Sequence, residues 1–204
     1  MKKLFTPVLI ALCSTMAYAQ QGTDQIQIIA EDDSIKFIMN GEVSSISNDD
    51  MADYYLAQGI EAANNGDFAS AEDKFRVALL YRTNDPEILY NLALSMFYQE
   101  DYTDAIHMLD ITADLEPDNE DIYNQRGLCK AMMGNYEAAD LDFKIMLKYA
   151  PDFPMGNYNY GILKLTTGDM EEACSYLRKS DTLGYESAPA IIAKYCGNSM
   201  DYSE

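Results

Sequence analysis

Apolar residues recur at helical spacing along most of the chain after residue 50. In the stretch 120–153, the small residues Gly127 and Ala131 continue one apolar helical face. Gly134 then interrupts this pattern, and a second apolar face follows and ends at Pro151. The sequence therefore predicts two amphipathic helices joined by a tight turn. Such a pair cannot bury both apolar faces alone, so it needs similar pairs on either side.

The same pattern recurs at a fixed period along the chain. Small residues repeat on the first helix as Gly59, Ala93, Gly127 and Gly161. Large apolar residues repeat on the second helix as Phe75, Leu109, Phe143 and Leu177. The turn position repeats as Gly66, Glu100, Gly134 and Gly168. We expect the small residues to lie where two helices approach closely, and the turn glycines to adopt the left-handed backbone conformation.

This pattern resembles the tetratricopeptide repeat, whose consensus has the same period and the same order of small and large positions. Four repeats fit one register, at 52–85, 86–119, 120–153 and 154–187. The resemblance implies an all-α fold, a right-handed α-solenoid of four helix pairs. A further helix at 186–196 is predicted to cap the last pair, because a solenoid must cover its terminal apolar face. The repeat domain thus spans 51–197, followed by a polar tail at 198–204.

The first residues are typical of a bacterial signal peptide. Lys2 and Lys3 precede an apolar run, 4–16, that is too short to span a bilayer, and small residues stand at Ala17 and Ala19. We therefore expect residues 1–19 to be a signal peptide that is cleaved after Ala19. This predicts an exported protein, located in the periplasm of a bacterium.

Residues 20–50 differ in composition from the repeats. Two short β-prone runs, 25–29 and 35–39, flank an acidic stretch, and Asn40 and Gly41 indicate a turn. Two interpretations remain open. The segment is either a flexible or extended leader, or it covers apolar surface of the repeats until a partner displaces it.

The charge and the motifs exclude several classes of function. The formal net charge is −20, which repels nucleic acid and anionic membrane surfaces. No segment after the signal peptide is apolar for long enough to span a membrane. His107 is the only histidine, and the sequence has no zinc ligand set, phosphate-binding glycine loop or catalytic triad. We therefore expect no enzyme activity, no cofactor and no metal.

Three cysteines remain after residue 19. Cys174 begins the second helix of the fourth repeat and Cys196 ends the capping helix, so the two are predicted to form a disulfide. Closing that loop would stabilise the fold by about 3 kcal/mol in the chain-entropy model. Cys129 lies inside a first helix and is predicted to be a small core residue.

In tetratricopeptide arrays the first helix of each repeat lines a concave groove that holds a partner's peptide or helix. By position, the resemblance assigns to this groove Leu56, Ile60, Tyr90, Asn91, Leu94, Phe97, Tyr98, Asn124, Leu128, Met132, Tyr158, Ile162 and Leu165. Asn91, Gln125 and Asn159 are candidate hydrogen-bonding groups for an extended backbone. Family members that grip acidic chaperone C-termini use groove lysines and arginines, but Asp121 and Gln125 occupy two of those positions here, so such a clamp is not expected.

These observations favour a non-enzymatic protein–protein interaction module, a scaffold in a cell-envelope assembly. Its partner would be a protein segment bound in an apolar groove. The alternative is a structural solenoid whose groove is filled by its own leader or by self-association.

Overall fold

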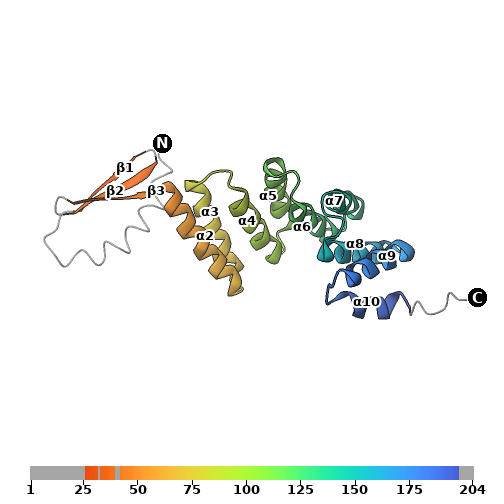
Figure 1. The fold of residues 1–204 in the computed structure, drawn as a ribbon. Coiled ribbons are helices and arrows are strands. Elements are labelled where there is room, and N and C mark those ends of the chain that lie inside the picture. The colour runs from red at the N-terminus through yellow and green to blue at the C-terminus, as the bar shows by residue number, and fades with distance from the viewer. Residues whose placement is uncertain (1–25, 32, 40–41, 198–204) are drawn as a thin grey trace, which may run out of the picture. The chain divides into compact units, whose positions relative to one another are not determined.

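The computed structural model describes residues 26–31, 33–39 and 42–197 (Figure 1). The predicted signal peptide, the first residues of the leader and the polar tail lie outside these residues. The described chain divides into two compact units, the first ending at Asp85 and the second beginning at Pro86. Both units contain antiparallel helix pairs. None of the helices in the described part of the chain is long and apolar enough to cross a membrane.

The first unit opens with a three-stranded antiparallel sheet of order β1-β2-β3. The strands are β1 (Ile26–Ala30), β2 (Ser34–Met39) and β3 (Glu42–Ser47). Ile35 of β2 is buried and pairs with Ile46 of β3. The β-prone runs therefore form strands, and the expectation of a flexible or merely extended leader is wrong for the described part of 26–47. The strands are separated by short connections, so each strand hydrogen-bonds to the next one in the sequence. This pairing satisfies backbone N–H and C=O groups that would have no partner in a single extended strand.

The first helix pair follows the sheet directly. It consists of α2 (Asn48–Asn64) and α3 (Phe68–Tyr81). The Ser47 hydroxyl accepts a hydrogen bond from the Asp50 amide at 3.0 Å, and the Asp50 carboxylate accepts one from the Ser47 amide at 3.2 Å. This reciprocal capping box starts the helix before residue 51, where the repeat domain was expected to begin.

The second unit contains three successive helix pairs and a final helix. The pairs are α4 (Pro86–Tyr98) with α5 (Tyr102–Leu115), α6 (Glu120–Met132) with α7 (Tyr136–Tyr149), and α8 (Pro154–Thr167) with α9 (Met170–Thr182). The first helices begin at Pro86, Glu120 and Pro154, where the predicted repeats begin. The register of these three helix pairs therefore agrees with the predicted one.

The turns between paired helices share one backbone conformation. Gly66, Gly134 and Gly168 have φ angles of 79°, 78° and 88°. Glu100 occupies the same position in its repeat with a φ of 66°. The left-handed turn predicted for the glycines is confirmed, and it is retained where the repeat lacks glycine.

Small residues on the first helices lie against large residues of the second helices, as predicted. A Cβ atom on Gly127 would lie 3.1 Å from the Phe143 ring. One on Gly161 would lie 2.8 Å from Cγ of Leu177. In both cases the paired helices approach too closely for a larger side chain to fit without movement.

The last helix, α10 (Ala188–Tyr195), contacts α9. The Sγ atoms of Cys174 and Cys196 are joined in a disulfide, and their Cα atoms are 5.5 Å apart. The Arg178 guanidinium donates a hydrogen bond to the Cys196 carbonyl at 3.1 Å. Cys129 is a buried free thiol. The final helix is thus attached to the last repeat at its C-terminal end.

Candidate protein-binding surface

The predicted partner-binding residues of the second unit lie on α4, α6 and α8. Helix α4 contacts α6, and α6 contacts α8, so these three first helices are neighbours. We call their residues at the predicted groove positions the first-helix surface: Tyr90, Asn91, Leu94, Phe97, Tyr98, Asn124, Leu128, Met132, Tyr158, Ile162 and Leu165. Tyr98 and Met132 are 59% and 60% exposed, and most of the others are half-buried.

Two of the predicted residues are more buried than a binding surface requires. Leu56 of α2 is 8% exposed and Asn124 of α6 is 2% exposed. In this structure neither side chain is exposed, so neither supports the predicted assignment to the groove. Leu56 belongs to the packing core of the first unit, while its neighbour Ile60 is half-buried. Helical spacing alone does not separate a position that packs against the next helix from one that faces solvent.

Aromatic side chains occur at both ends of the first-helix surface. The Phe97 ring contacts Tyr98 edge-on, with ring centroids 5.4 Å apart, and also contacts Tyr102 at 5.6 Å. On α8, the Tyr158 ring lies 4.9 Å from that of Tyr185. Such contacts hold aromatic rings in place, so less conformational entropy would be lost when a partner covers them.

The predicted amide groups make different interactions. Nδ2 of Asn159 donates to Oδ1 of Asn124 at 2.9 Å, which links α8 to α6. Nδ2 of Asn91 donates to the Glu87 carbonyl of its own helix at 2.8 Å. Gln125 is 7% exposed, and its Nε2 has no hydrogen-bond partner among the described residues. An unsatisfied buried amide donor is costly, so it would gain from an acceptor.

The cations on α6 are paired with carboxylates of second helices. The Arg126 guanidinium lies 2.7 Å from a carboxylate oxygen of Asp142 on α7 and 2.7 Å from one of Asp110 on α5. The Lys130 ammonium also lies 2.7 Å from Asp142. Asp142 is only 2% exposed, so its pairs with Arg126 and Lys130 form a buried ionic contact within one repeat, whereas Asp110, which is 54% exposed, links Arg126 to the preceding repeat.

The cation on α8 is paired in the same way. Lys164 lies 2.8 Å from Asp140 of α7 and 2.8 Å from Glu172 of α9. The Tyr160 hydroxyl donates to Asp140 at 2.8 Å. Although burial opposes the shift, the hydrogen bonds from Lys144, Lys164 and Tyr160 lower the pKa of Asp140 to about 2.

One acidic residue beside the first-helix surface occupies a groove position of the chaperone-binding family members, but it is not among the predicted partner-binding residues. Asp121 of α6 is half-buried, and burial together with the nearby Glu120 carboxylate raises its pKa. It is close enough to Tyr90 of α4 that, after burial, its charge contributes to raising the pKa of that phenol. Asp121 makes no ion pair with any residue in the described part of the chain. The sequence signal that could have identified Asp121 as a surface residue was its position as the second residue of a first helix.

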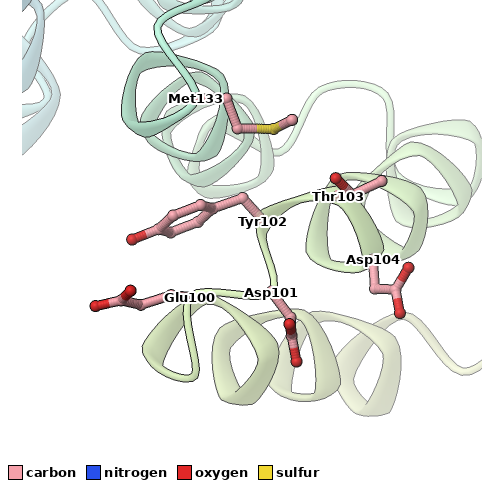
Figure 2. A pocket seen from close by; sticks show the side chains of 6 residues that line it. All are labelled: Glu100, Asp101, Tyr102, Thr103, Asp104 and Met133. Atoms are coloured by element: carbon pink, nitrogen blue, oxygen red, sulfur yellow. The ribbon is translucent and has the colours of Figure 1, made fainter.

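A separate cavity of about 240 Å³ lies at the turn between α4 and α5. Figure 2 shows the lining side chains, with Met133 facing Tyr102 and the carboxylates of Glu100, Asp101 and Asp104 around the turn. In the described ranges, no group of three or more histidine, cysteine, aspartate or glutamate side chains could hold a metal ion. His107 is exposed on α5, a second helix.

Comparison with known proteins supports the repeat assignment. A model of the tetratricopeptide repeat family matches residues 56–106 and, in an overlapping alignment, residues 90–139. Tandem helix pairs of this length define a helical-repeat protein. Residues 56–139 therefore match the tetratricopeptide repeat family, in agreement with the repeating pattern of the sequence.

Solved structures with the same fold are distant in sequence. MamA (residues 41 to the end) from Desulfovibrio magneticus RS-1 is 20% identical with a TM-score of 0.60, over 66% of this chain and 76% of that one. YrrB, a TPR protein with an unusual peptide-binding site, is 22% identical with a TM-score of 0.60, over 70% and 74%. The Cut9–Hcn1 hetero-tetramer of the APC/C is 16% identical with a TM-score of 0.65, over 71% of this chain and 30% of that one. A search of curated protein sequences gave no match.

Proposed function

We propose that this protein is a non-enzymatic protein–protein interaction module that binds a peptide or helix of a partner on its first-helix surface. The observation that carries the proposal is the exposure of large side chains on that surface. Tyr98 and Met132 are more than half exposed at positions where the resemblance places a partner. Exposed aromatic and methionine side chains are enriched in protein interfaces, and burying them on a partner removes apolar area from water.

The comparisons support this class of function through the fold. Tetratricopeptide repeats generally serve as interaction modules without catalytic groups, and YrrB is described as having a peptide-binding site. The same neighbouring first helices occur in this chain, and their side chains are mostly apolar with interspersed amides. An extended or helical partner segment would contact several first helices in succession.

The proposal includes a location in the cell envelope. Its support is the amino-terminal sequence, in which two lysines, a short apolar run and small residues resemble a signal peptide. Amino-terminal sequencing of protein recovered from a bacterial periplasmic fraction should begin at Gln20. An intact Met1 on protein retained in the cytoplasm would contradict this part of the proposal.

A structural role with self-association remains the second candidate. It is favoured by the sheet of the first unit, because β1 and β3 are edge strands whose outer backbone groups can pair with a second copy. In that case the first-helix surface would contact another copy of the same chain. The two candidates differ in the identity of the bound protein.

Site-specific photocrosslinking tests the proposal. A photoreactive amino acid replaces Met132 on α6 or, as a matched control, Leu141 on α7, which is 62% exposed but lies on a second helix. We expect one foreign protein to be captured from the native envelope at position 132 and not at 141. Crosslinks at position 132 only to a second copy of the chain would favour the structural role. Equal capture at both positions would contradict a binding surface on the first helices.

A further inference from the structure

The charges on the first helices of the second unit are sorted by sign. Arg126 and Lys130 of α6 and Lys164 of α8 all pair with carboxylates on second helices. The acidic residues of the same first helices, Glu87 and Asp121 among them, have no such ion pair in the described part of the chain. Each cation is therefore neutralised on the side toward a second helix, and the charge left over on the first helices is negative.

Asp121 is more confined than Glu87 among these unpaired carboxylates. It is half-buried at the start of α6, whereas Glu87 of α4 is exposed. Burial of a carboxylate without a cation is unfavourable, since water is removed and no opposite charge replaces it. A cation supplied by a partner would stabilise Asp121 more than it would stabilise an exposed carboxylate.

A tyrosine of the neighbouring helix α4 lies near Asp121. Tyr90 of α4 is close to Asp121 and to Tyr98. The Tyr98 ring is more than half exposed. Tyrosine faces attract lysine and arginine head groups, and the effect adds to pairing with a carboxylate. Leu94 of the same helix and Leu128 of α6 supply half-buried apolar surface for the residues on either side of the cation.

A second observation on α6 indicates a polypeptide rather than an isolated cation. Gln125 lies one helical turn after Asp121, is more than nine-tenths buried, and carries an Nε2 donor without a partner in the described residues. The Nε2 atom is covered in the unbound chain, so the Gln125 side chain would have to shift before it could donate to a backbone carbonyl of a bound segment. Charge and hydrogen-bonding capacity on α6 are thus both complementary to a basic peptide segment.

We propose that the first-helix surface of α4 and α6 binds a segment of a partner protein that presents a lysine or arginine between apolar residues, with Asp121 as its ionic partner. This inference rests on the proposed function and specifies its partner. Asp121 is then the residue that selects a basic segment over a neutral or acidic one. The charge at this position is negative, whereas family members that grip acidic chaperone C-termini use positively charged lysines and arginines.

A selection experiment tests the proposal without knowledge of the natural partner. A phage-displayed library of random twelve-residue peptides is selected on the purified protein, on Asp121→Asn and on Asp181→Asn. Asp181 is exposed on α9, a second helix, so it controls for the loss of one negative charge. Peptides enriched on the natural protein and on Asp181→Asn are expected to share a lysine or arginine between apolar residues, and this feature should be lost on Asp121→Asn.

A double-mutant cycle then assigns the contact. A synthetic selected peptide and its Lys→Gln or Arg→Gln variant are titrated against the natural protein and Asp121→Asn by fluorescence anisotropy. Each single change should weaken binding on the order of tenfold, and the two together no more than either alone. Asp121→Glu keeps the charge and should retain the preference for the basic peptide. Circular dichroism melting of both variants establishes that they fold.

The outcomes separate this inference from the function on which it rests. Selected peptides without a shared cation, or equal affinity for Asp121→Asn, would overturn the basic-segment inference and leave the binding surface in place. The same holds if the effects of the two changes add independently. If no enriched peptide competes with the partner that is captured by photocrosslinking at position 132, the proposed function would be overturned as well.

Discussion

The Asp142 carboxylate lies 2.7 Å from the Arg126 guanidinium, and only 2% of the Asp142 side chain is exposed. The same carboxylate pairs with Lys130, and Arg126 also reaches Asp110 of the preceding repeat. Two neighbouring repeats are therefore joined by a cluster in which one acidic group is buried and the other is exposed. This difference gives a direct test of how much burial matters.

Asp142→Ala should lower the free energy of unfolding by about 3 kcal/mol, because it leaves two cations next to a buried site without their carboxylate. Asp110→Ala removes the other partner of Arg126 at a position that is 54% exposed, and should cost less than about 1 kcal/mol. Urea unfolding followed by circular dichroism measures both. Equal losses in the free energy of unfolding for the two variants would show that the buried ion pairs of Asp142 contribute no more to stability than the exposed pair of Asp110.

Glu100→Gly is expected to stabilise the protein by about 1 kcal/mol. Glu100 adopts a φ of 66°, which is unfavourable for a residue with a Cβ atom and normal for glycine. Gly134→Ala, at the same position of the next repeat, should destabilise the protein by a similar amount. Thermal melting compares the two. A fall in stability for Glu100→Gly would mean that the Glu100 side chain makes a contact worth more than the backbone strain.

After removal of residues 1–19 the protein has three cysteines, and two of them form the disulfide. The unreduced protein should therefore have one free thiol, that of Cys129. Alkylation in denaturant followed by mass measurement is expected to add one group without reductant and three with it. In the folded protein Cys129 should resist alkylation at pH 8, because burial raises the pKa of its thiol to about 12. Three groups added without reductant would contradict the disulfide.

Replacing Cys174 and Cys196 by serine should lower stability by about 3 kcal/mol in the chain-entropy model. The loss should be largest for α10, which the disulfide attaches to the last repeat. Hydrogen exchange would show this as faster exchange in Ala188–Tyr195 than in α4. Unchanged exchange in α10 would mean that its packing on α9 is sufficient without the bond.

Acid should destabilise the protein partly through Asp140. Its pKa in the folded state is about 2, below the ordinary value of 3.8. A lowered folded-state pKa contributes stability that is present above the unfolded value and is lost as pH falls through the folded value. Asp140→Asn should therefore reduce the drop in stability between about pH 4 and pH 2, relative to the natural protein. An identical pH profile for both proteins would contradict the role of Lys144, Lys164 and Tyr160 in holding this carboxylate ionised.

The helical repeats were predictable because their constraints are local and recur. Close packing requires Gly127 opposite Phe143 and Gly161 opposite Leu177, and the left-handed turns require a residue such as Gly134 at a fixed spacing. Each constraint appears again in the next repeat, so a residue that departs from the pattern in one repeat does not change the structure predicted from the other repeats. Glu100 shows that the turn geometry persists even where the preferred residue is missing.

The sheet and the binding surface were less predictable, for different reasons. The strands around Ile35 depend on which short run pairs with which, and no repeated copy fixes that choice. Leu56 and Asn124 fit the helical spacing of the first-helix surface, yet neighbouring elements bury them. Asp121 became a candidate only when the structure showed that Arg126 and Lys130 pair elsewhere.

The central claim, that the first helices bind a partner segment, is tested most directly by amide chemical-shift mapping. Isotope-labelled protein is titrated with a peptide selected from the random library. We predict that the largest shift changes fall on α4, α6 and α8, including Leu128 and Met132, and that Leu141 on α7 changes little. Changes concentrated on α5, α7 and α9, or on the strands of the first unit, would contradict the account.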